Sequence, residues 1–327
     1  MKYSLPMNLA LPAVALLALL SPTMTASSPV LAQVPAAAPQ ELRNDAPIAE
    51  VAANGPPGIV PLPETDLAAQ PLPRPNAETL LEQATTMLAR RRSIVAKLRY
   101  QAQLFERAVV GSGDYVQGPA SSRLMRYEVR MQIGDREIHQ LQVNDGRYLW
   151  QQRQYKDTPE LERIDVEKVL AAEQGSGAAP AGNALAVLGL GGLGRMLTTL
   201  HNDFVFQKVF RAQLDGVNVY GIEGTWRPEV LQTLGFDSAA KLRTHVPDRV
   251  VIYFGCDDFF PYRFEYLRTP SGAGQGTDAT PQTLLVIELF EVQFDVLLDD
   301  ALFRFNAGSR SFVDVTDRAL SARTARP

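Results

Sequence analysis

The chain has 327 residues, a formal net charge of −4 at pH 7, 46% hydrophobic residues and one cysteine. This mild acidity lacks the basic surplus with which proteins hold nucleic acid, so we expect no nucleic-acid partner. A single cysteine excludes an internal disulfide, so the hydrophobic core alone must stabilise the fold.

The N-terminus has the pattern of a secretory signal. A positively charged start precedes an apolar run at residues 9–20, which is too short to span a bilayer. The small residues Val30 and Ala32 predict cleavage after Ala32, with a site after Ala26 as the alternative. We therefore expect residues 1–32 to be a signal peptide and the mature protein to be soluble outside the cytoplasm.

The next segment, residues 33–76, is rich in Pro and Ala and has no hydrophobic periodicity. Such a composition buries too little apolar surface to order itself, which predicts a disordered tether. About 240 residues follow, a length that suits one domain, and we assign it to residues 77–318 with a short tail at 319–327.

A helix is expected at the start of this domain. Asn76 is a suitable N-cap, and apolar residues recur at helical spacing up to Arg92. The basic residues 90–92 lie at the end of this helix, where they complement its dipole. We favour that role over phosphate binding.

Period-two alternation then predicts strands. Leu98, Tyr100, Ala102 and Leu104 share one face of the first, and Met125, Tyr127, Val129 and Met131 share one face of the second. Further strands are expected at 136–143, 147–154, 204–214, 217–226, 249–254, 262–267 and 284–294. Short turns join several of them, as at Asp215-Gly216, and strands joined so tightly are antiparallel.

Helical patterns interrupt the strands at residues 164–173, 183–204 and 228–235. A Gly/Ala/Pro insertion at 175–182 separates the first two. A polar hairpin loop is expected at 271–281.

The second of these helices contains the sequence GLGGLG at residues 189–194, which fits the dinucleotide spacing G-x-G-x-x-G. That motif functions between a strand and a helix of a parallel βαβ unit, and no such unit is predicted here. We expect no nucleotide. Arg195 is the only charge between Ala184 and Leu200, and each glycine costs a helix about 1 kcal/mol relative to alanine. The segment is either an ordinary core helix or a loosely held, movable one.

Two stretches resemble the LolA-like family of periplasmic lipoprotein carriers. In residues 141–152 a strand runs into Asp-Gly and the next strand carries an aromatic residue; in 290–317 a long strand is followed by D-x-x-x-F-x-F and Val-x-Asp. The matching residues are Val143, Asp145, Gly146, Leu149 and Trp150 in the first stretch, and Phe303, Phe305, Val313 and Asp314 in the second.

The resemblance implies an α+β fold, a curved antiparallel half-barrel sheet with helices closing the concave mouth as a lid over an apolar cavity for acyl chains. Residues 183–204 then fall where the family has lid helices. The candidate cavity-wall residues are Leu98, Tyr100, Leu104, Met125, Tyr127, Val129 and Met131; the lid candidates are Leu188, Leu190, Leu193, Met196 and Leu197.

Catalytic chemistry is not predicted. His139, His201 and His245 show no metal-ligand spacing, and no nucleophile or phosphate-binding motif is present. Cys256 is read as an inert strand-end residue, and it lies far from the cleavage site, so no lipidation is expected there. We assign no catalytic, cofactor-binding or metal residues and expect no enzyme.

The favoured function is a monomeric carrier of acylated cargo, whose partners are acyl chains of a lipoprotein or lipid. The alternative is an envelope sensor or interaction module of the same fold, acting through a membrane protein partner. Fold alone does not choose between them.

Overall fold

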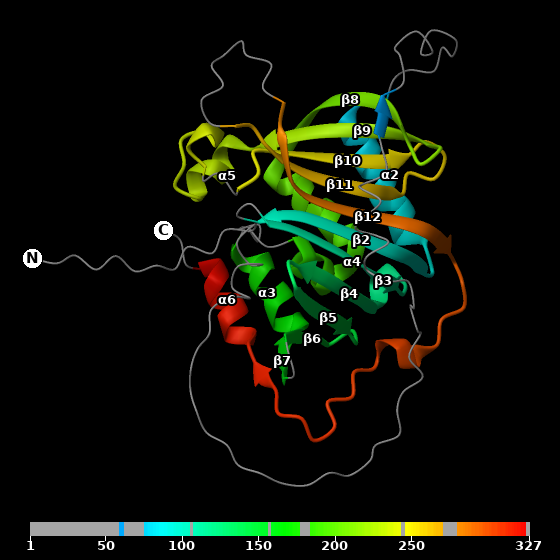
Figure 1. Ribbon diagram of the computed structural model, residues 1–327, viewed down its shortest axis with the longest axis vertical. Coiled ribbons are helices and arrows are strands. Elements are labelled where there is room, and N and C mark those ends of the chain that lie inside the picture. The colour runs from blue at the N-terminus through cyan, green and yellow to red at the C-terminus, as the bar shows by residue number, and fades with distance from the viewer. Residues whose placement is uncertain are drawn as a thin grey trace, which may run out of the picture.

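The computed structural model describes residues 59–61, 75–104, 107–155, 158–176, 184–242, 246–270 and 280–324 (Figure 1). The expected signal peptide, its cleavage site and most of the expected tether lie outside these ranges. So do the larger parts of the expected insertion and of the expected polar loop.

One sheet contains all thirteen strands of the described residues. Every neighbouring pair is antiparallel except β13 and β7, which are parallel. Across the sheet the strands are β1 (Ile59–Pro61), β8 (Phe204–Leu214), β9 (Val217–Trp226), β10 (Arg249–Gly255), β11 (Pro261–Arg268), β12 (Gln282–Phe294), β2 (Ile94–Leu104), β3 (Arg107–Gln117), β4 (Met125–Ile133), β5 (Arg136–Asn144), β6 (Tyr148–Tyr155), β7 (Thr158–Asp165) and β13 (Val313–Asp314).

The sheet curls around two helices, α2 (Ala77–Arg90) and α4 (Ala184–Asp203), as Figure 1 shows. The predicted fold class is therefore confirmed: an α+β half-barrel with helices on its concave side, as a LolA-like fold requires. The remaining helical segments are α3 (Val166–Ser176), α5 (Pro228–Thr233), α6 (Thr316–Thr324) and the 3₁₀ turns η3 (Ala120–Ser122), η4 (Ala239–Lys241) and η5 (Asp300–Phe303).

Local sequence signals explain where several elements begin and turn. The side chain of Asn76 accepts a hydrogen bond from the Thr79 N–H at 2.7 Å and so caps α2. In the β8–β9 hairpin, Asp215 and Gly216 have φ values of 47° and 82°. Two left-handed residues in succession form the tight turn whose twist matches that of the flanking strands, as Asp-Gly predicts.

The main core fills the space between the concave face and the two enclosed helices. Leu80, Leu81, Ala84 and Leu88 form the buried stripe of α2. They belong to the same hydrophobic cluster as the inward-facing residues of β2 to β4 and of β9 to β12. The sheet and the two helices therefore form a single hydrophobic unit.

Strand β3 is not among the predicted strands. Its inward-facing positions include Gly111 and Gly113, which pair with Met131 and Val129. A Cβ at Gly113 would lie 2.9 Å from the Val129 Cα, and one at Gly111 would lie 2.8 Å from the Arg130 carbonyl oxygen. Close approach of β4 thus requires glycine here, and the glycines remove the apolar alternation by which a strand is predicted.

The expected helix at 164–173 starts too early. Ile164 and Asp165 belong to β7, and α3 begins at Val166. Ile164 pairs with Leu149 in the sheet, and the Asp165 carboxylate accepts the Lys168 N–H at 3.1 Å. Asp165 is therefore both the last residue of the strand and the cap of the helix. Hydrophobic periodicity does not reveal this boundary.

Candidate functional site

The central feature of the candidate site is a kink in α4. Gly191 has φ −168° and ψ 20°, and Gly192 has φ 70° and ψ −162°, so residues 184–190 and 193–203 are two helical segments joined at an angle. The conformation of Gly192 is one that only glycine adopts readily. The glycine-rich motif therefore bends an enclosed helix, and the antiparallel sheet around it offers no βαβ unit for a dinucleotide.

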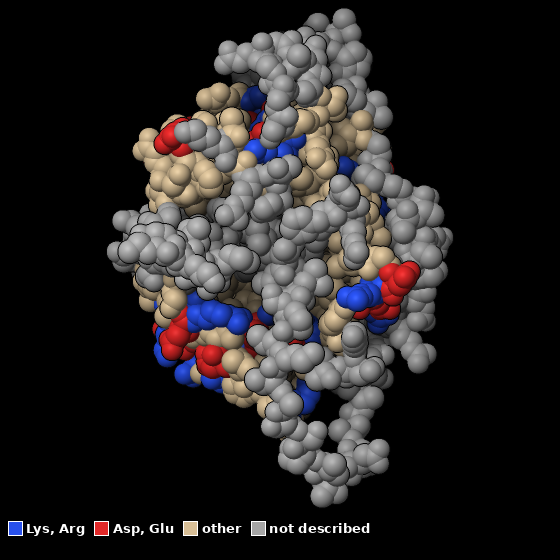
Figure 2. Space-filling view, turned by 60° about the vertical axis from the view of Figure 1, so that its left-hand side comes forward, with Lys and Arg blue, Asp and Glu red and all other residues tan. Residues whose placement is uncertain are grey.

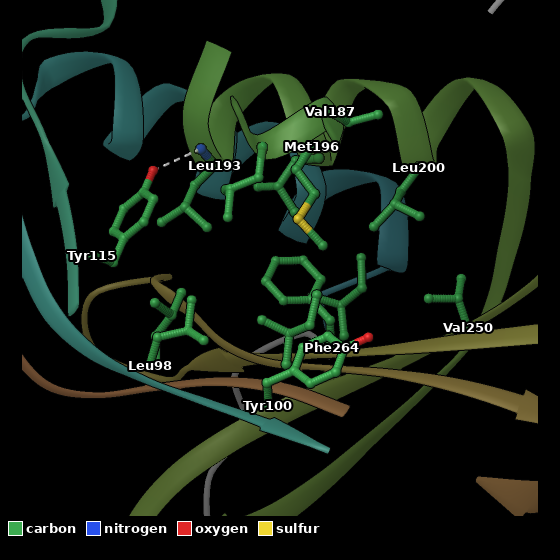
Figure 3. Packing of buried hydrophobic residues seen from close by; sticks show 14 of the residues in the cluster. Leu98, Tyr100, Tyr115, Val187, Leu193, Met196, Leu200, Val250 and Phe264 are labelled. Atoms are coloured by element: carbon green, nitrogen blue, oxygen red, sulfur yellow. Dashed lines mark hydrogen bonds between the residues drawn. The ribbon is translucent and has the colours of Figure 1, made fainter. Parts of the chain in front are cut away.

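The segment after the kink packs onto the candidate wall. In Figure 3, Leu193 and Met196 of α4 point toward the sheet, above Leu98, Tyr100 and Phe264. Six of the seven candidate wall residues belong to the same buried cluster as four lid candidates. These are Leu98, Tyr100, Met125, Tyr127, Val129 and Met131 on the wall, and Leu188, Leu193, Met196 and Leu197 on the lid. The side chain of Leu104, the seventh wall candidate, lies outside the described residues.

Leu190 lies in a different environment from the other lid candidates. It belongs to a second, smaller cluster with Leu149 of β6 and with Val166 and Val169 of α3. Leu190 is therefore anchored against α3 and the last strands, whereas Leu188 and the apolar residues after the kink pack into the main core.

Little space remains between the bend of α4 and the adjoining residues of β3, η3 and β4. The pocket found at this site is a narrow crevice at the kink that does not admit a water molecule. Its lining residues are Gln117, Pro119, Ala120, Arg123, Leu124, Met125, Gly191 and Gly192. In this conformation, the apolar side chains of α4 cover inward-facing apolar residues of the sheet.

Four buried amide side chains form a polar row on the same concave face, which we call the amide row. Its members are Gln117 of β3 and Gln140, Gln142 and Asn144 of β5, with exposed fractions of 5%, 8%, 2% and 0%. The row was not among the predicted site residues. A signal for it exists, because Ile138, Gln140, Gln142 and Asn144 alternate at the strand period on the face that Ile138 buries.

The amide row binds the backbone of the kink. The Asn144 Nδ2 donates to the carbonyl oxygens of Gly189 and Leu190 at 3.2 and 3.3 Å. The Leu193 N–H donates to the Gln117 Oε1 at 3.2 Å and to the Tyr115 hydroxyl oxygen at 3.3 Å. The Tyr115 hydroxyl itself donates to the Gln117 Oε1.

Two glycines of the motif permit this close approach. A Cβ at Gly192 would lie 2.7 Å from the Gln117 Cδ and 3.1 Å from the Tyr115 hydroxyl oxygen. A Cβ at Gly189 would overlap the Gln142 Oε1 and lie 3.2 Å from the Leu149 Cδ2. By contrast, Gly194 has no such neighbour within 4 Å.

Buried ionisable groups near α4 favour their neutral forms. Burial raises the pKa of the Tyr115 and Tyr127 hydroxyls well above their usual range, so both remain hydrogen-bonding phenols. At the end of α4, burial raises the pKa of the Asp203 carboxyl to about 7, and the nearby Arg227 opposes this shift. At neutral pH both tyrosines are therefore uncharged, and the Asp203 carboxyl is near the midpoint of its titration.

The described surface carries both signs of charge. On the face shown in Figure 2, basic and acidic side chains lie in small mixed groups. Within the described ranges, no three His, Cys, Asp or Glu side chains converge in a group that could hold a metal ion. Among the helices described, none has the length and apolar character that crossing a membrane requires.

The chain is similar to several solved structures at low sequence identity. No family model matches the sequence, and no curated protein matches it. A putative outer membrane lipoprotein-sorting protein domain from Vibrio parahaemolyticus is 12% identical with a TM-score of 0.30, over 70% of this chain and 100% of that one. A LolA superfamily protein from Nitrosomonas europaea is 12% identical with a TM-score of 0.26, over 71% of this chain and 99% of that one.

Pseudomonas aeruginosa MucB, solved in complex with MucA, is 10% identical with a TM-score of 0.33, and the match covers 70% of this chain and 60% of that one. These scores are too low to carry an argument about activity. The strand order and the two enclosed helices carry the fold assignment.

Proposed function

We propose that this protein binds and carries acylated cargo in the periplasm, with α4 as a movable lid over the concave face. The observation that supports this most directly is the kinked helix whose Leu193 and Met196 side chains rest on an apolar wall. An acyl chain that displaced α4 would meet the same wall. Each methylene that it transferred from water would contribute about 0.8 kcal/mol.

The mechanism requires no catalytic group. Opening exposes a few side chains, each worth about 1.5 to 3 kcal/mol of burial, and a long acyl chain replaces them with a similar apolar area. The exchange is thus nearly balanced, which allows both uptake and release. The protein acts as a single chain in this proposal, and the cargo leaves when an acceptor buries the chain better.

Shortening a lid side chain distinguishes a lid from an ordinary core helix. In the closed state Leu193 competes with the ligand for the wall, so Leu193→Ala should raise the apparent affinity for a fluorescent 16-carbon fatty acid by about tenfold. Leu231→Ala on α5 is the matched control, since Leu231 belongs to the same cluster but lies on another helix. It should lower the stability and leave the affinity unchanged. Equal effects of the two variants on affinity would refute the lid assignment.

A second candidate function is supported by the outer edge of β8. Residues Ile59, Val60 and Pro61 pair with Leu214, Gln213 and Ala212 and so add a short strand to that edge. An edge that accepts a strand from its own chain has the hydrogen-bonding groups to accept one from a partner. This favours an interaction module that acts through an envelope protein.

Native mass spectrometry of the protein purified from its own envelope separates the two functions. A bound lipid mass supports the carrier. Lipid-free protein that co-purifies in a fixed ratio with one membrane protein supports the interaction module.

A further inference from the structure

The amide row is the polar part of a face that is otherwise apolar. Its four side chains are uncharged, and the sheet register pairs Gln140 with Val129 and Gln142 with Tyr127 of β4. On the neighbouring strands, Arg153 of β6 forms an ion pair with Glu162 of β7. Such a row suits neutral groups that offer hydrogen bonds, such as carbonyls and amides, better than carboxylates or phosphates.

The lid backbone supplies such groups to the row in the closed state. Gly189 and Leu190 present two carbonyl oxygens to Asn144, and Leu193 presents one N–H to Gln117. When α4 moves aside, these amides lose their partners while still lying in an apolar surrounding, which is costly. A ligand that enters is therefore favoured if it replaces the lid's carbonyl and N–H groups.

Gln142 has an unused acceptor in the row. Its side chain is 2% exposed, and its Oε1 accepts no hydrogen bond from any described residue. That oxygen lies against Gly189, where any larger residue would overlap it. The closed lid thus covers this oxygen without donating to it, which leaves one position for a hydrogen-bond donor of the ligand.

We infer that the amide row recognises the linkage of an N-acylated ligand, and that Gln142 determines specificity by accepting the ligand's amide N–H. The acyl carbonyl takes the place of the lid carbonyls at Asn144, and the chain extends from there onto the apolar wall. The inference rests on the proposed carrier function and adds a preference for acyl amides over acyl esters.

Two probes that differ at one position test this preference. N-hexadecanoyl glycinamide carries an amide N–H where its ester counterpart, hexadecanoyl glycolamide, carries an oxygen atom. Competition against a fluorescent 16-carbon fatty acid on the full chain measures both affinities. We expect the wild-type protein to bind the amide roughly fivefold to tenfold more tightly, the usual effect of one additional buried hydrogen bond.

Two variants test whether Gln142 is the residue that causes the preference for the amide probe. Gln142→Leu should bind both probes with equal affinity, because it removes the unused acceptor. Gln132→Leu makes the same change on β4 at a position that faces away from α4, and it should keep the wild-type preference. An equal affinity of the wild-type protein for the two probes, or a preference that survives in Gln142→Leu, would overturn the inference and leave the carrier function intact. Failure of the wild-type protein to bind any 16-carbon probe would instead refute the carrier function.

Discussion

The backbone N–H of Leu193 lies 3.3 Å from the hydroxyl oxygen of Tyr115, at the point where α4 bends (Figure 3). In a regular helix this N–H would donate to the Gly189 carbonyl oxygen, four residues earlier. Here the Gly189 oxygen accepts from Asn144 instead. Side chains of the sheet thus replace the hydrogen-bond partners that the kink separates, which holds α4 at its middle through a small number of polar contacts.

Removing the Tyr115 hydroxyl should loosen the kink. In Tyr115→Phe, Gln117 remains as an acceptor for the Leu193 N–H but loses the hydroxyl that also donates to it. We expect faster amide hydrogen exchange in residues 187–196, measured by mass spectrometry, and a loss of about 1 kcal/mol in the free energy of unfolding.

Tyr127→Phe is the control for this measurement. The Tyr127 hydroxyl is also buried and accepts from the Gln140 Nε2 at 2.9 Å, but no hydrogen bond joins it to α4. It should cost a similar stability without accelerating exchange in α4. Acceleration of the same size in both variants would show that the Tyr115 contact does not hold α4 at the kink.

Alanine substitutions at Gly192 and Gly194 should change the free energy of unfolding in opposite directions. Gly192 has φ 70° and close neighbours, so Gly192→Ala should cost about 2 kcal/mol or more of unfolding free energy in urea titrations. Gly194 lies in the second helical segment with open space around its Cα. Gly194→Ala should therefore stabilise the protein by about 0.5 to 1 kcal/mol. A neutral Gly192→Ala would mean that the kink is not required.

Sequence patterns were sufficient for most of the fold. Alternation predicted β2, β4, β5 and β6, and Asp215-Gly216 predicted the β8–β9 turn. Each of these signals depends on residues close together in the sequence, and each element is formed by those same residues. Strand β3 was not predicted because its glycines serve a contact with β4, a neighbour that a single strand's sequence does not identify.

The candidate site could be predicted only in part. The apolar residues of α4 and of the wall were expected to enclose a cavity for acyl chains, whereas in the structure most of them belong to one packed cluster. The glycines predicted a helix able to shift or kink, but the apolar stripe continues through them and does not locate the bend at Gly191 and Gly192. Asn144 shows the reason most clearly: its side chain both caps the β5–β6 turn, by accepting the Gly146 N–H, and donates to the Gly189 carbonyl of α4, 45 residues away. Only the first of these contacts is local in sequence.

The C-terminal segment is held on the outer face by an aromatic contact. Phe305 stacks on Trp150 of β6 with ring centroids 5.3 Å apart. Phe305→Ala should reduce the free energy of unfolding by about 1 to 2 kcal/mol and speed protease cleavage within residues 295–312. Leu297→Ala in the same segment is the control: Leu297 is fully exposed, so its loss should change the stability by less than about 0.5 kcal/mol. Equal cleavage rates in the two variants would argue against the stacking contact as the anchor.

Asp203, where α4 joins β8, should make stability depend on pH. Burial raises the pKa of its carboxyl from 3.8 to about 7, so between roughly pH 4 and pH 7 the native state holds a proton that the unfolded chain has lost. Ionisation at higher pH therefore costs the native state stability, and the cost levels off above pH 7. In Asp203→Asn, which cannot ionise, the free energy of unfolding relative to wild type should rise from pH 4.5 to pH 8 in urea titrations.

Glu128 provides a control of opposite sign. Its hydrogen bond to His139, assisted by Arg126, lowers the pKa of the Glu128 carboxyl to about 2, so this carboxylate stabilises the native state above its unfolded pKa of 4.5. That contribution is lost as the pH falls toward 2. Relative to wild type, Glu128→Gln should therefore lose stability as the pH rises from 2 to 5. An Asp203→Asn difference that stays flat across pH 4.5 to 8 would mean that Asp203 is ionised and adequately solvated in the native state, and that the junction between α4 and β8 is open to water.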